Sequence, residues 1–484
     1  MAKVWDLEEY ERGAALVVAA LVDYIGSSQS GEGPALSAPP LEAVLAELDA
    51  RRLVREGGLD LESFEPWLRT LLERSTRLHH PGELAHQVAA PDVPAALADL
   101  LHGAANQPMS IYEMGAASGA LEAAVIEWMT EHVGWDARAG GVLTHGGSLA
   151  NLTALLAARA AAAPDAWHAG MNGGLAMLAP PSAHYSLKRS AAMLGLGERA
   201  VIPLEVDEYE RILPHRLEAA LELADAEGLR PMALVAAACA TSTGLHDDLE
   251  AVGRFCRERE IWFHVDAAHG ASALLSPAHR RLLRGIELAD SVVWDAHKML
   301  RTSGLCAAVL VRDGRRLDAA FQQEAAYLIY DHDAGEPQPD LLGRQVECTK
   351  APLGLKVFLN LAWRGEHGLG EYVATQYDKT ARFFELIEAR EGFHCLCPPE
   401  SNILCFRFGD DSALQVALRE RLVREGRFHL SSTEIHGRRW LRMAVMAPAT
   451  DEATVEGLLD AIERVAADLT ADAQGRLDDP ARQA

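Results

Sequence analysis

The stretch SVVWDAHKML, residues 291–300, places an acid, a histidine and a lysine at the end of an apolar run. Lysine is rare in this chain, which mostly uses arginine as its basic residue. The lysines are Lys3, Lys188, Lys298, Lys350, Lys356 and Lys379. A guanidinium stays protonated in a protein, whereas a desolvated ammonium can lose its proton and become a nucleophile. Lys298 lies at the end of a strand that the apolar run predicts to be buried, and its position therefore indicates a chemically reactive side chain.

Around this stretch, short apolar runs alternate with helical patterns between about residues 106 and 350. Segments such as LANLTALLAARAAAA (149–163) and LEAVGRFCRERE (249–260) have helical spacing and separate the runs. This alternation predicts an α/β fold with a largely parallel sheet that is covered on both faces. The predicted strands lie in GGVLTHGG (140–147), GLAMLAPPSAHYS (174–186), MALVAAACATS (232–242), IWFHVDAA (261–268), SVVWDAHK (291–298) and CAAVLVRD (306–313).

The two ends of the chain have other patterns. Residues 1–105 are expected to form a helical N-terminal segment, since AALVVAALVDYIG (14–26) and LEAVLAELDARRL (41–53) have helical spacing. Residues 106–355 would form the large domain. Residues 356–470, with strand-like SNILCFRFG and RRWLRMAVM and a closing helix, predict a small α+β domain. The polar residues 471–484 are expected to be a flexible tail.

Composition narrows the classes of function. The chain has 484 residues, of which 49% are hydrophobic, and this supports sizeable packed cores. Its formal net charge of −25 argues against a general binder of nucleic acid or of anionic membranes, which would repel it. The seven cysteines form no CxxC pair, and the start lacks the pattern of a signal peptide. These features predict a cytoplasmic protein.

In open parallel sheets, ligands bind beyond the carboxyl ends of the strands. Asp266 follows the apolar run IWFHV, and Lys298 ends the next predicted strand, so one crossover would bring both to the same rim. An acid and a lysine could simply form a salt bridge there. They also fit a pyridoxal phosphate site, in which the lysine holds the cofactor aldehyde as a Schiff base and the acid keeps the pyridine nitrogen protonated.

Two further features fit the same cofactor. The segment THGGSLANLTALLAAR (144–159) offers glycines, a serine hydroxyl and a helix N-terminus to a phosphate, although Gly and Ser are also ordinary residues at a helix start. His184, in SAHYSLKRSA, could stack on a flat ring, although a lone histidine is more often a surface or core residue.

The motifs THGGSLANLTALLAAR, AHYSLKRSA, HVDAAHGAS, SVVWDAHKML and VECTKAPLGLKVFLNLAWRGEHGLGEYV together resemble the group II pyridoxal-phosphate-dependent amino-acid decarboxylases. That family includes glutamate, cysteine-sulfinate, 2,4-diaminobutyrate and aromatic amino-acid decarboxylases. The similarity runs from about residue 79 to residue 465. It implies the aspartate-aminotransferase-like fold of fold type I. The segments HPGELAHQVAAP and NQPMSIYEMG are more similar to the diaminobutyrate and glutamate branches than to the aromatic branch.

The resemblance implies catalytic roles for four residues. Lys298 would be the Schiff-base lysine, Asp266 the partner of the pyridine nitrogen, and His184 the residue that stacks on the ring. A tyrosine on a mobile loop protonates Cα in the family, and the corresponding segment here, YDHDAGEPQPDLLGRQ, contains only Tyr330, near its start. Either Tyr330 would donate this proton, or a histidine or water would do so. Without such a donor, the resemblance also allows oxidative deamination to an aldehyde.

The resemblance further implies which residues bind cofactor and substrate. Gly147 and Ser148 would bind the phosphate, Ala268 would pack on the second face of the ring, and Thr241 and His297 would lie beside the cofactor. Arg442 and Gln87 would contact the substrate, with Arg442 either meeting the substrate carboxylate, as in family members with acidic substrates, or forming a structural salt bridge in the small domain. One departure is Asp295, where several family members carry Asn. An extra acid near a phosphate is unfavourable, so Asp295 is expected to point elsewhere or to pair with an arginine.

The predicted function is decarboxylation of an L-amino acid to the amine and carbon dioxide, with a small polar or charged substrate such as diaminobutyrate, glutamate or aspartate. The alternatives are an aromatic amino-acid decarboxylase, a pyridoxal-phosphate-dependent aldehyde synthase or carbon–carbon lyase, and a non-enzymatic homologue, against which Lys298 argues. The resemblance implies a homodimer with shared active sites, and the helical N-terminal segment, residues 1–105, is expected to form the dimer interface. No metal, nucleic-acid or membrane partner is expected.

Overall fold

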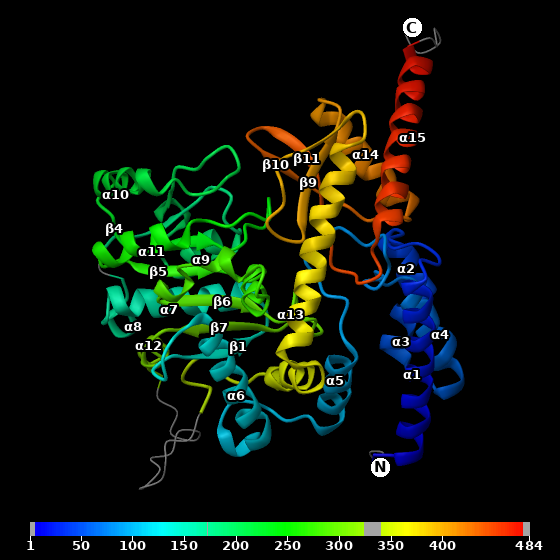
Figure 1. Cartoon of the computed structure of the whole chain (residues 1–484). Helices are drawn as coiled ribbons and strands as arrows, with labels where there is room; N and C mark the ends of the chain where they lie inside the picture. The colour runs from blue at the N-terminus through cyan, green and yellow to red at the C-terminus, as the bar shows by residue number, and fades with distance from the viewer. Residues whose placement is uncertain (1–4, 172, 324–339, 478–484) are drawn as a thin grey trace. The chain divides into compact units, whose positions relative to one another are not determined.

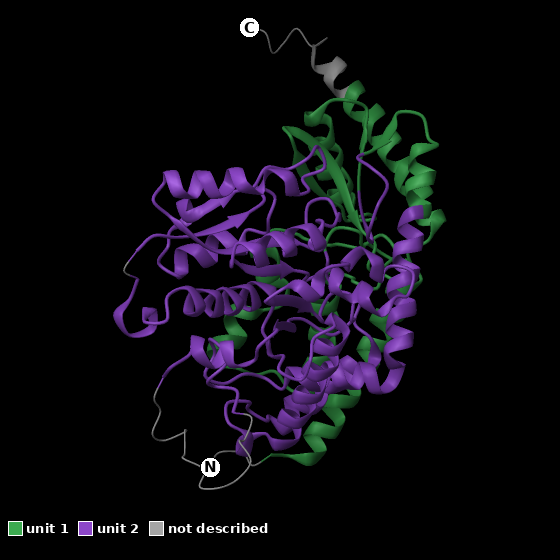
Figure 2. Ribbon diagram, turned by 60° about the vertical axis from the view of Figure 1, so that its left-hand side comes forward, with its two compact units in different colours: residues 1–86, 382–395, 405–484 green, residues 87–381, 396–404 purple. Residues whose placement is uncertain are grey.

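The computed structural model describes residues 5–171, 173–323 and 340–477 (Figure 1). The chain divides into two compact units (Figure 2). Unit 1 comprises residues 1–86, 382–395 and 405–484, and unit 2 comprises residues 87–381 and 396–404. The domain boundaries that the sequence predicts, at residues 105 and 355, differ from this division and remain a prediction.

Unit 2 is built on a seven-stranded sheet in the order β1-β7-β6-β5-β4-β2-β3. The pairs β3–β2, β2–β4, β4–β5 and β5–β6 are parallel. The predicted α/β fold with a largely parallel sheet is therefore confirmed. The strands are β1 Gly140–Thr144, β2 Leu175–Ala179, β3 Val201–Pro203, β4 Arg230–Ala237, β5 Trp262–Asp266, β6 Ser291–Asp295 and β7 Ala307–Val311.

One strand of this sheet runs against the others. β7 pairs antiparallel with both β6 and β1. The link from β6 to β7, residues 296–306, contains no helix, so the chain returns beside β6 without a crossover. The apolar run CAAVLVRD predicts the strand itself but gives no sign of its reversed direction.

The burial of the strands on both faces of the sheet explains why the predicted strand segments are continuously apolar. Every residue of β2, β6 and β7 is buried, as in sheets covered on both faces. Alanines of α7 pack on β6 and β7, while Leu155 of the same helix packs with β2 and α9. The helices of unit 2 are α5 Val93–Ala105, α6 Ala116–Val133, α7 Gly147–Ala162, α8 Ala166–Ala169, α9 Ser186–Met193, α10 Leu217–Ala226, α11 Leu249–Glu258, α12 Arg315–Ala320 and most of α13 Leu353–Glu388.

Unit 1 combines N-terminal helices with a four-stranded sheet in the order β10-β11-β9-β8, in which the pairs β10–β11 and β8–β9 are antiparallel. The helical pattern of residues 41–53 forms two helices rather than one, because the chain breaks at Asp49, whose φ of 46° is left-handed. The closing helix continues to Leu477, so the predicted tail from residue 471 begins as helix. The elements are α1 Leu7–Gln29, α2 Leu41–Glu47, α3 Ala50–Glu56, α4 Leu61–Glu73, β8 Phe393–Cys395, β9 Ile403–Phe408, α14 Ser412–Glu425, β10 Ser431–Ile435, β11 Arg438–Ala444 and α15 Glu452–Leu477.

Within the part of the chain that the structure describes, no helix combines the length and the apolar character that crossing a membrane requires.

Candidate active site

Unit 2 contains a cavity of about 280 Å³ at the carboxyl ends of its parallel strands. Its walls come from the turns and loops that follow β1, β2, β4, β5 and β6. The structure brings together in this cavity all the residues that the sequence assigns to the cofactor. They are Gly147, Ser148, His184, Thr241, Asp266, Ala268, His297 and Lys298.

Asp266 and Lys298 reach this cavity because of strand register. Asp266 is the last residue of β5 and lies opposite Val293 of the parallel strand β6, which ends shortly before Lys298. Among the described residues, the ion pair of Lys298 is made with Asp295 and not with Asp266. The simple salt-bridge interpretation of Asp266 and Lys298 therefore does not hold in this structure.

Asp266 is held by hydrogen-bond donors. Asn151 of α7 donates from Nδ2 to Asp266 Oδ2 at 3.0 Å, and the Ala268 backbone N–H donates to Oδ1 at 3.3 Å. Hydrogen bonds to the ionised form favour a carboxylate over a carboxylic acid. The two donors thus hold the Asp266 side chain in place at the cavity.

A buried relay behind Asp266 fixes the orientation of Asn151. Burial lowers the pKa of His264 to about 4, so the ring is neutral at neutral pH. His264 Nε2 lies 2.9 Å from Asn151 Oδ1, which can only accept, so Nε2 carries the hydrogen. His264 Nδ1 then accepts from the Ser291 hydroxyl at 2.8 Å, and Trp262 Nε1 donates to the same hydroxyl at 2.8 Å.

Sequence reasoning missed this relay, although it left a signal. Asn151 interrupts an apolar helical run, and His264 interrupts an apolar strand. A polar residue in such a position needs a buried hydrogen-bond partner, and these two residues are partners of each other.

The turn between β1 and α7 offers a site for an anion. Gly146 has a φ of 99°, which favours glycine, and α7 begins at Gly147 and runs for 16 residues. The first backbone amides of a helix have no partner within the helix and carry its positive dipole end. With Ser148 beside them in the cavity wall, they fit a phosphate group.

His184 lies in the loop after β2 and presents a neutral ring. Burial lowers its pKa. The Ser186 backbone N–H donates to His184 Nδ1 at 3.3 Å, so Nδ1 accepts and Nε2 carries the hydrogen. Ala268, from the loop after β5, adds a small side chain to the same cavity. A neutral ring and a methyl group suit the two faces of a flat ligand.

Asp295 does not behave as the sequence predicted. The expectation that it points elsewhere or pairs with an arginine is wrong, because its Oδ2 lies 3.0 Å from Lys298 Nζ. Its side chain is buried and lines the cavity.

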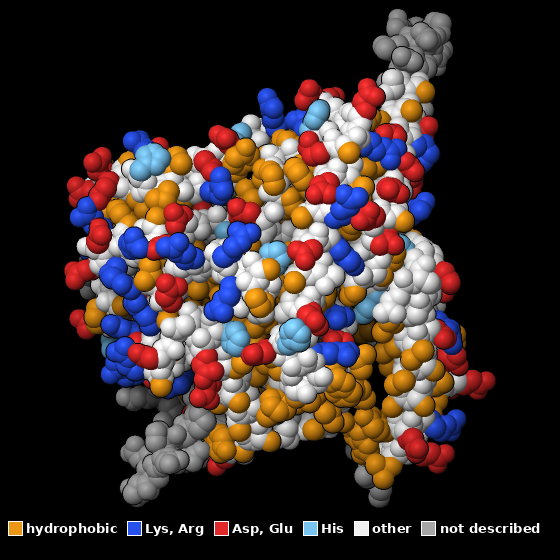
Figure 3. All heavy atoms as spheres, viewed as in Figure 1, with side chains coloured by type: hydrophobic (Ala, Val, Ile, Leu, Met, Phe, Trp, Pro, Cys, Tyr) orange, Lys and Arg blue, Asp and Glu red, His pale blue; other side chains and the backbone are white. Residues whose placement is uncertain are grey.

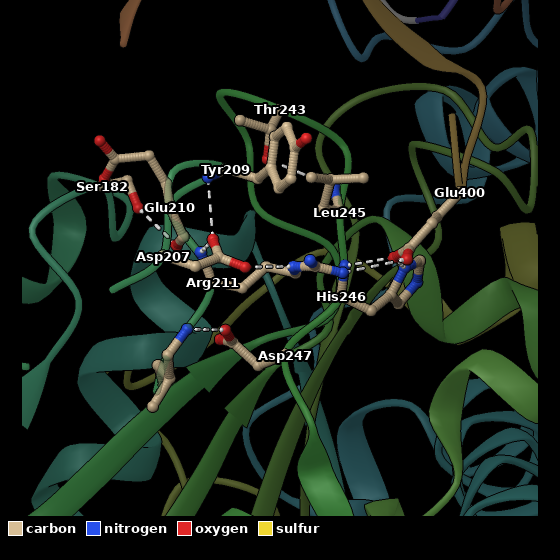
Figure 4. Close-up of polar contacts among 11 residues, drawn as sticks. Ser182, Asp207, Tyr209, Glu210, Arg211, Thr243, Leu245, His246, Asp247 and Glu400 are labelled. Carbon is tan, nitrogen blue, oxygen red and sulfur yellow. Dashed lines mark hydrogen bonds and ion pairs between the residues drawn. The ribbon is translucent and has the colours of Figure 1, made fainter. Parts of the chain in front are cut away.

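A polar cluster in unit 2 holds His246 and Asp247, which follow β4 in the chain (Figure 4). Asp247 accepts from the backbone N–H groups of Ile212 at 2.8 Å and of Ala237, the last residue of β4, at 2.7 Å. The His246 backbone N–H donates to Glu400 at 2.8 Å. Burial raises the pKa of Asp247 to about 6, against the lowering effect of its two donors.

Three predicted residues are not placed in this cavity. Arg442 belongs to unit 1, where its Nη1 donates to the Ala85 carbonyl oxygen and to Ser431 Oγ, each at 3.1 Å. Gln87 is in unit 2 but is absent from the described residues that line the cavity. Tyr330 lies outside the described residues. The roles of all three remain predictions.

Comparison with known proteins gives the family of the chain. Residues 64–409, more than half of the chain, match the pyridoxal-dependent decarboxylase conserved domain. The chain belongs to this family of pyridoxal-dependent decarboxylases.

Individual relatives match most of the chain. The acidic amino acid decarboxylase GADL1 of Bos taurus is 31% identical and covers 85% of this chain and 84% of its own. The L-2,4-diaminobutyrate decarboxylase of Rhizobium meliloti is 32% identical and covers 83% of this chain and 81% of its own. The crystal structure of mouse CSAD is 29% identical, with a TM-score of 0.89, and covers 96% of this chain and 99% of its own.

The cavity fits the cofactor of this family. It combines an amine, an acid held in place by hydrogen bonds, a neutral imidazole and the amide end of a helix, which match the aldehyde, ring nitrogen, ring face and phosphate of pyridoxal phosphate. The chain is a pyridoxal-phosphate-dependent carboxy-lyase of fold type I.

The relay behind Asp266 should give the protein a measurable pH dependence. The unfolded chain protonates His264 near pH 6.5 and the folded chain near pH 4, so this histidine lowers the free energy of unfolding as the pH falls through that window. The shift corresponds to about 3 kcal/mol. Asp247 acts in the opposite direction, because its raised pKa adds stability as the pH falls below 6.

We therefore expect His264→Gln to lose less stability than the wild type between pH 7.5 and pH 4.5 in urea unfolding. His215→Gln, at an exposed histidine, is the control and should follow the wild type. Equal changes in the wild type and His264→Gln would show that the folded ring is not held neutral.

Proposed function

We propose that this decarboxylase acts on a small L-amino acid with a polar or charged side chain and releases the amine and carbon dioxide. The observation that carries the proposal is the meeting of Lys298 and Asp266 in one cavity, from neighbouring parallel strands. The supporting relatives are an acidic amino-acid decarboxylase and a diaminobutyrate decarboxylase.

Each of the residues that line the cavity has its own role in binding the cofactor. Pyridoxal phosphate, when bound, supplies the electron sink that decarboxylation of an amino acid requires. Lys298 provides the amine that holds the cofactor, and Asp266 keeps a proton on the cofactor's ring nitrogen. His184 stacks on the ring, while Ser148 and the first amides of α7 bind the phosphate. The protein thus contributes orientation and electrostatics.

Substrate contacts are part of the proposal. Arg442, a buried cation of unit 1, is proposed to meet a substrate carboxylate, and Gln87 is proposed as a second polar contact. Tyr330 is proposed as the proton donor to Cα. An aromatic substrate is the weaker alternative, because the relatives that support the proposal act on acidic or diamino substrates by their names.

The substrate proposal is tested by measuring carbon dioxide, amine and peroxide from the loaded enzyme with glutamate, aspartate, cysteine sulfinate, diaminobutyrate, tyrosine and tryptophan. We expect equal amounts of amine and carbon dioxide from an acidic or diamino substrate. Preference for tyrosine or tryptophan would contradict the proposed substrate class. Formation of peroxide in stoichiometric amounts would show that the enzyme catalyses oxidative deamination and not simple decarboxylation.

Asp266→Asn should separate catalysis from cofactor binding. The amide cannot hold a proton on the ring nitrogen by charge, so we expect turnover to fall by at least about 100-fold, or about 3 kcal/mol in the barrier. The phosphate contacts are untouched, so the cofactor absorbance should remain. The control is Asp313→Asn, which removes an acid that pairs with Arg315 outside the cavity. Normal turnover in Asp266→Asn would refute the role of Asp266.

We also propose a homodimer and a cytoplasmic location. Helix α5 of unit 2 exposes an apolar stripe at Val93, Leu97, Leu100 and Leu101 (Figure 3). A stripe at this helical spacing favours burial against another surface. None of the seven cysteines, all of which lie in the described part of the chain, forms a disulfide, which suits a reducing compartment. Recovery of the chain from a disulfide-forming compartment in cell fractionation would contradict the proposed location.

The dimer proposal predicts a change of mass. Analytical ultracentrifugation of the wild type should give twice the chain mass. The double variant Leu97→Glu and Leu101→Glu should dissociate at micromolar concentration, because four charges would enter the apolar contact across a two-fold axis. Leu223→Glu, at an exposed leucine of α10, should leave the dimer intact. A monomeric wild type would exclude the proposal.

A further inference from the structure

A buried carboxylate stands at the proposed phosphate site. The Asp295 side chain is only 2% exposed. A Cβ added to Gly147, the first residue of α7, would lie 2.9 Å from each of its carboxylate oxygens. Asp295 Oδ1 has no hydrogen-bond partner among the described residues. An anion therefore already lies against the helix end that is proposed to take the phosphate.

The same carboxylate lies close to two basic side chains of the cavity. Lys298 Nζ lies 3.0 Å from Asp295 Oδ2, and His297 Nε2 lies 3.7 Å from the same oxygen. His297 Nδ1 lies 2.8 Å from the carbonyl oxygen of Cys306, and the backbone N–H of Cys306 donates to the same Nδ1 at 3.3 Å.

The negative charge of Asp295 affects how strongly a phosphate can bind at this site. Two anions a few ångströms apart in a buried site repel each other far more strongly than they do in water. A ligand with a phosphate meets this repulsion in full, whereas the same ligand without the phosphate does not. Both ligands, however, need the amine of Lys298.

We propose that Asp295 is a positioning residue that holds the amine of Lys298 in the cavity and weakens the grip of the site on the phosphate of the cofactor. This proposal rests on the proposed function, since it takes the cavity as the cofactor site. It makes the carboxylate a determinant of how readily the cofactor exchanges.

The test compares two ligands that differ only in the phosphate. The full-length protein is freed of cofactor, and equilibrium titrations with pyridoxal phosphate and with pyridoxal are followed by absorbance for the wild type, Asp295→Asn and Asp295→Ala. We expect both variants to bind pyridoxal phosphate at least about tenfold more tightly. Pyridoxal should change by less than about threefold.

The results of these titrations can overturn the proposed role of Asp295 in several ways. An equal change for the two ligands would overturn the proposal, because Asp295 would then act through Lys298 alone. Weaker binding of pyridoxal phosphate by Asp295→Asn would also overturn it, provided that circular dichroism and thermal unfolding match the wild type. If Asp295→Asn does not fold, the same comparison with Asp295→Ala decides. Binding of pyridoxal phosphate by none of the three proteins would refute the proposed function itself.

Discussion

The site depends on the register between two parallel strands. β5 and β6 are hydrogen-bonded neighbours. Asp266 is the last residue of β5, Lys298 follows the end of β6, and both residues line one cavity. A slip of one residue in either strand would turn its side chains to the opposite face of the sheet. Because β6 is buried throughout, such a slip would also disturb the core, so the core that stabilises unit 2 also aligns the site.

Polar groups buried behind the site extend this alignment. Asn151, His264 and Ser291 come from α7, β5 and β6, and each satisfies the hydrogen-bonding groups of the next. A buried polar group that loses its partner costs about 1–3 kcal/mol. The relay thus joins the orientation of the Asp266 carboxylate to the packing of a helix on the sheet.

The sequence carries much of this architecture in local patterns. Apolar runs bounded by turn residues locate the main strands of unit 2, and polar residues directly after those runs locate Asp266, Lys298 and His184. The reversed direction of β7 has no local pattern, because it depends on a link whose conformation is set by its surroundings. The ion pair of Asp295 with Lys298 was missed for a similar reason: spacing shows that two side chains are near each other but not which partner each selects. The roles of Arg442, Gln87 and Tyr330 come from resemblance alone.

The central claim is that Lys298 is the amine that holds the cofactor. Treatment of the loaded protein with borohydride, followed by proteolysis and mass mapping, tests it most directly, because reduction fixes the cofactor to whichever amine carries it. The account predicts one modified residue, Lys298. A cofactor fixed to Lys188, Lys350 or another lysine, or no modified lysine at all, would contradict it.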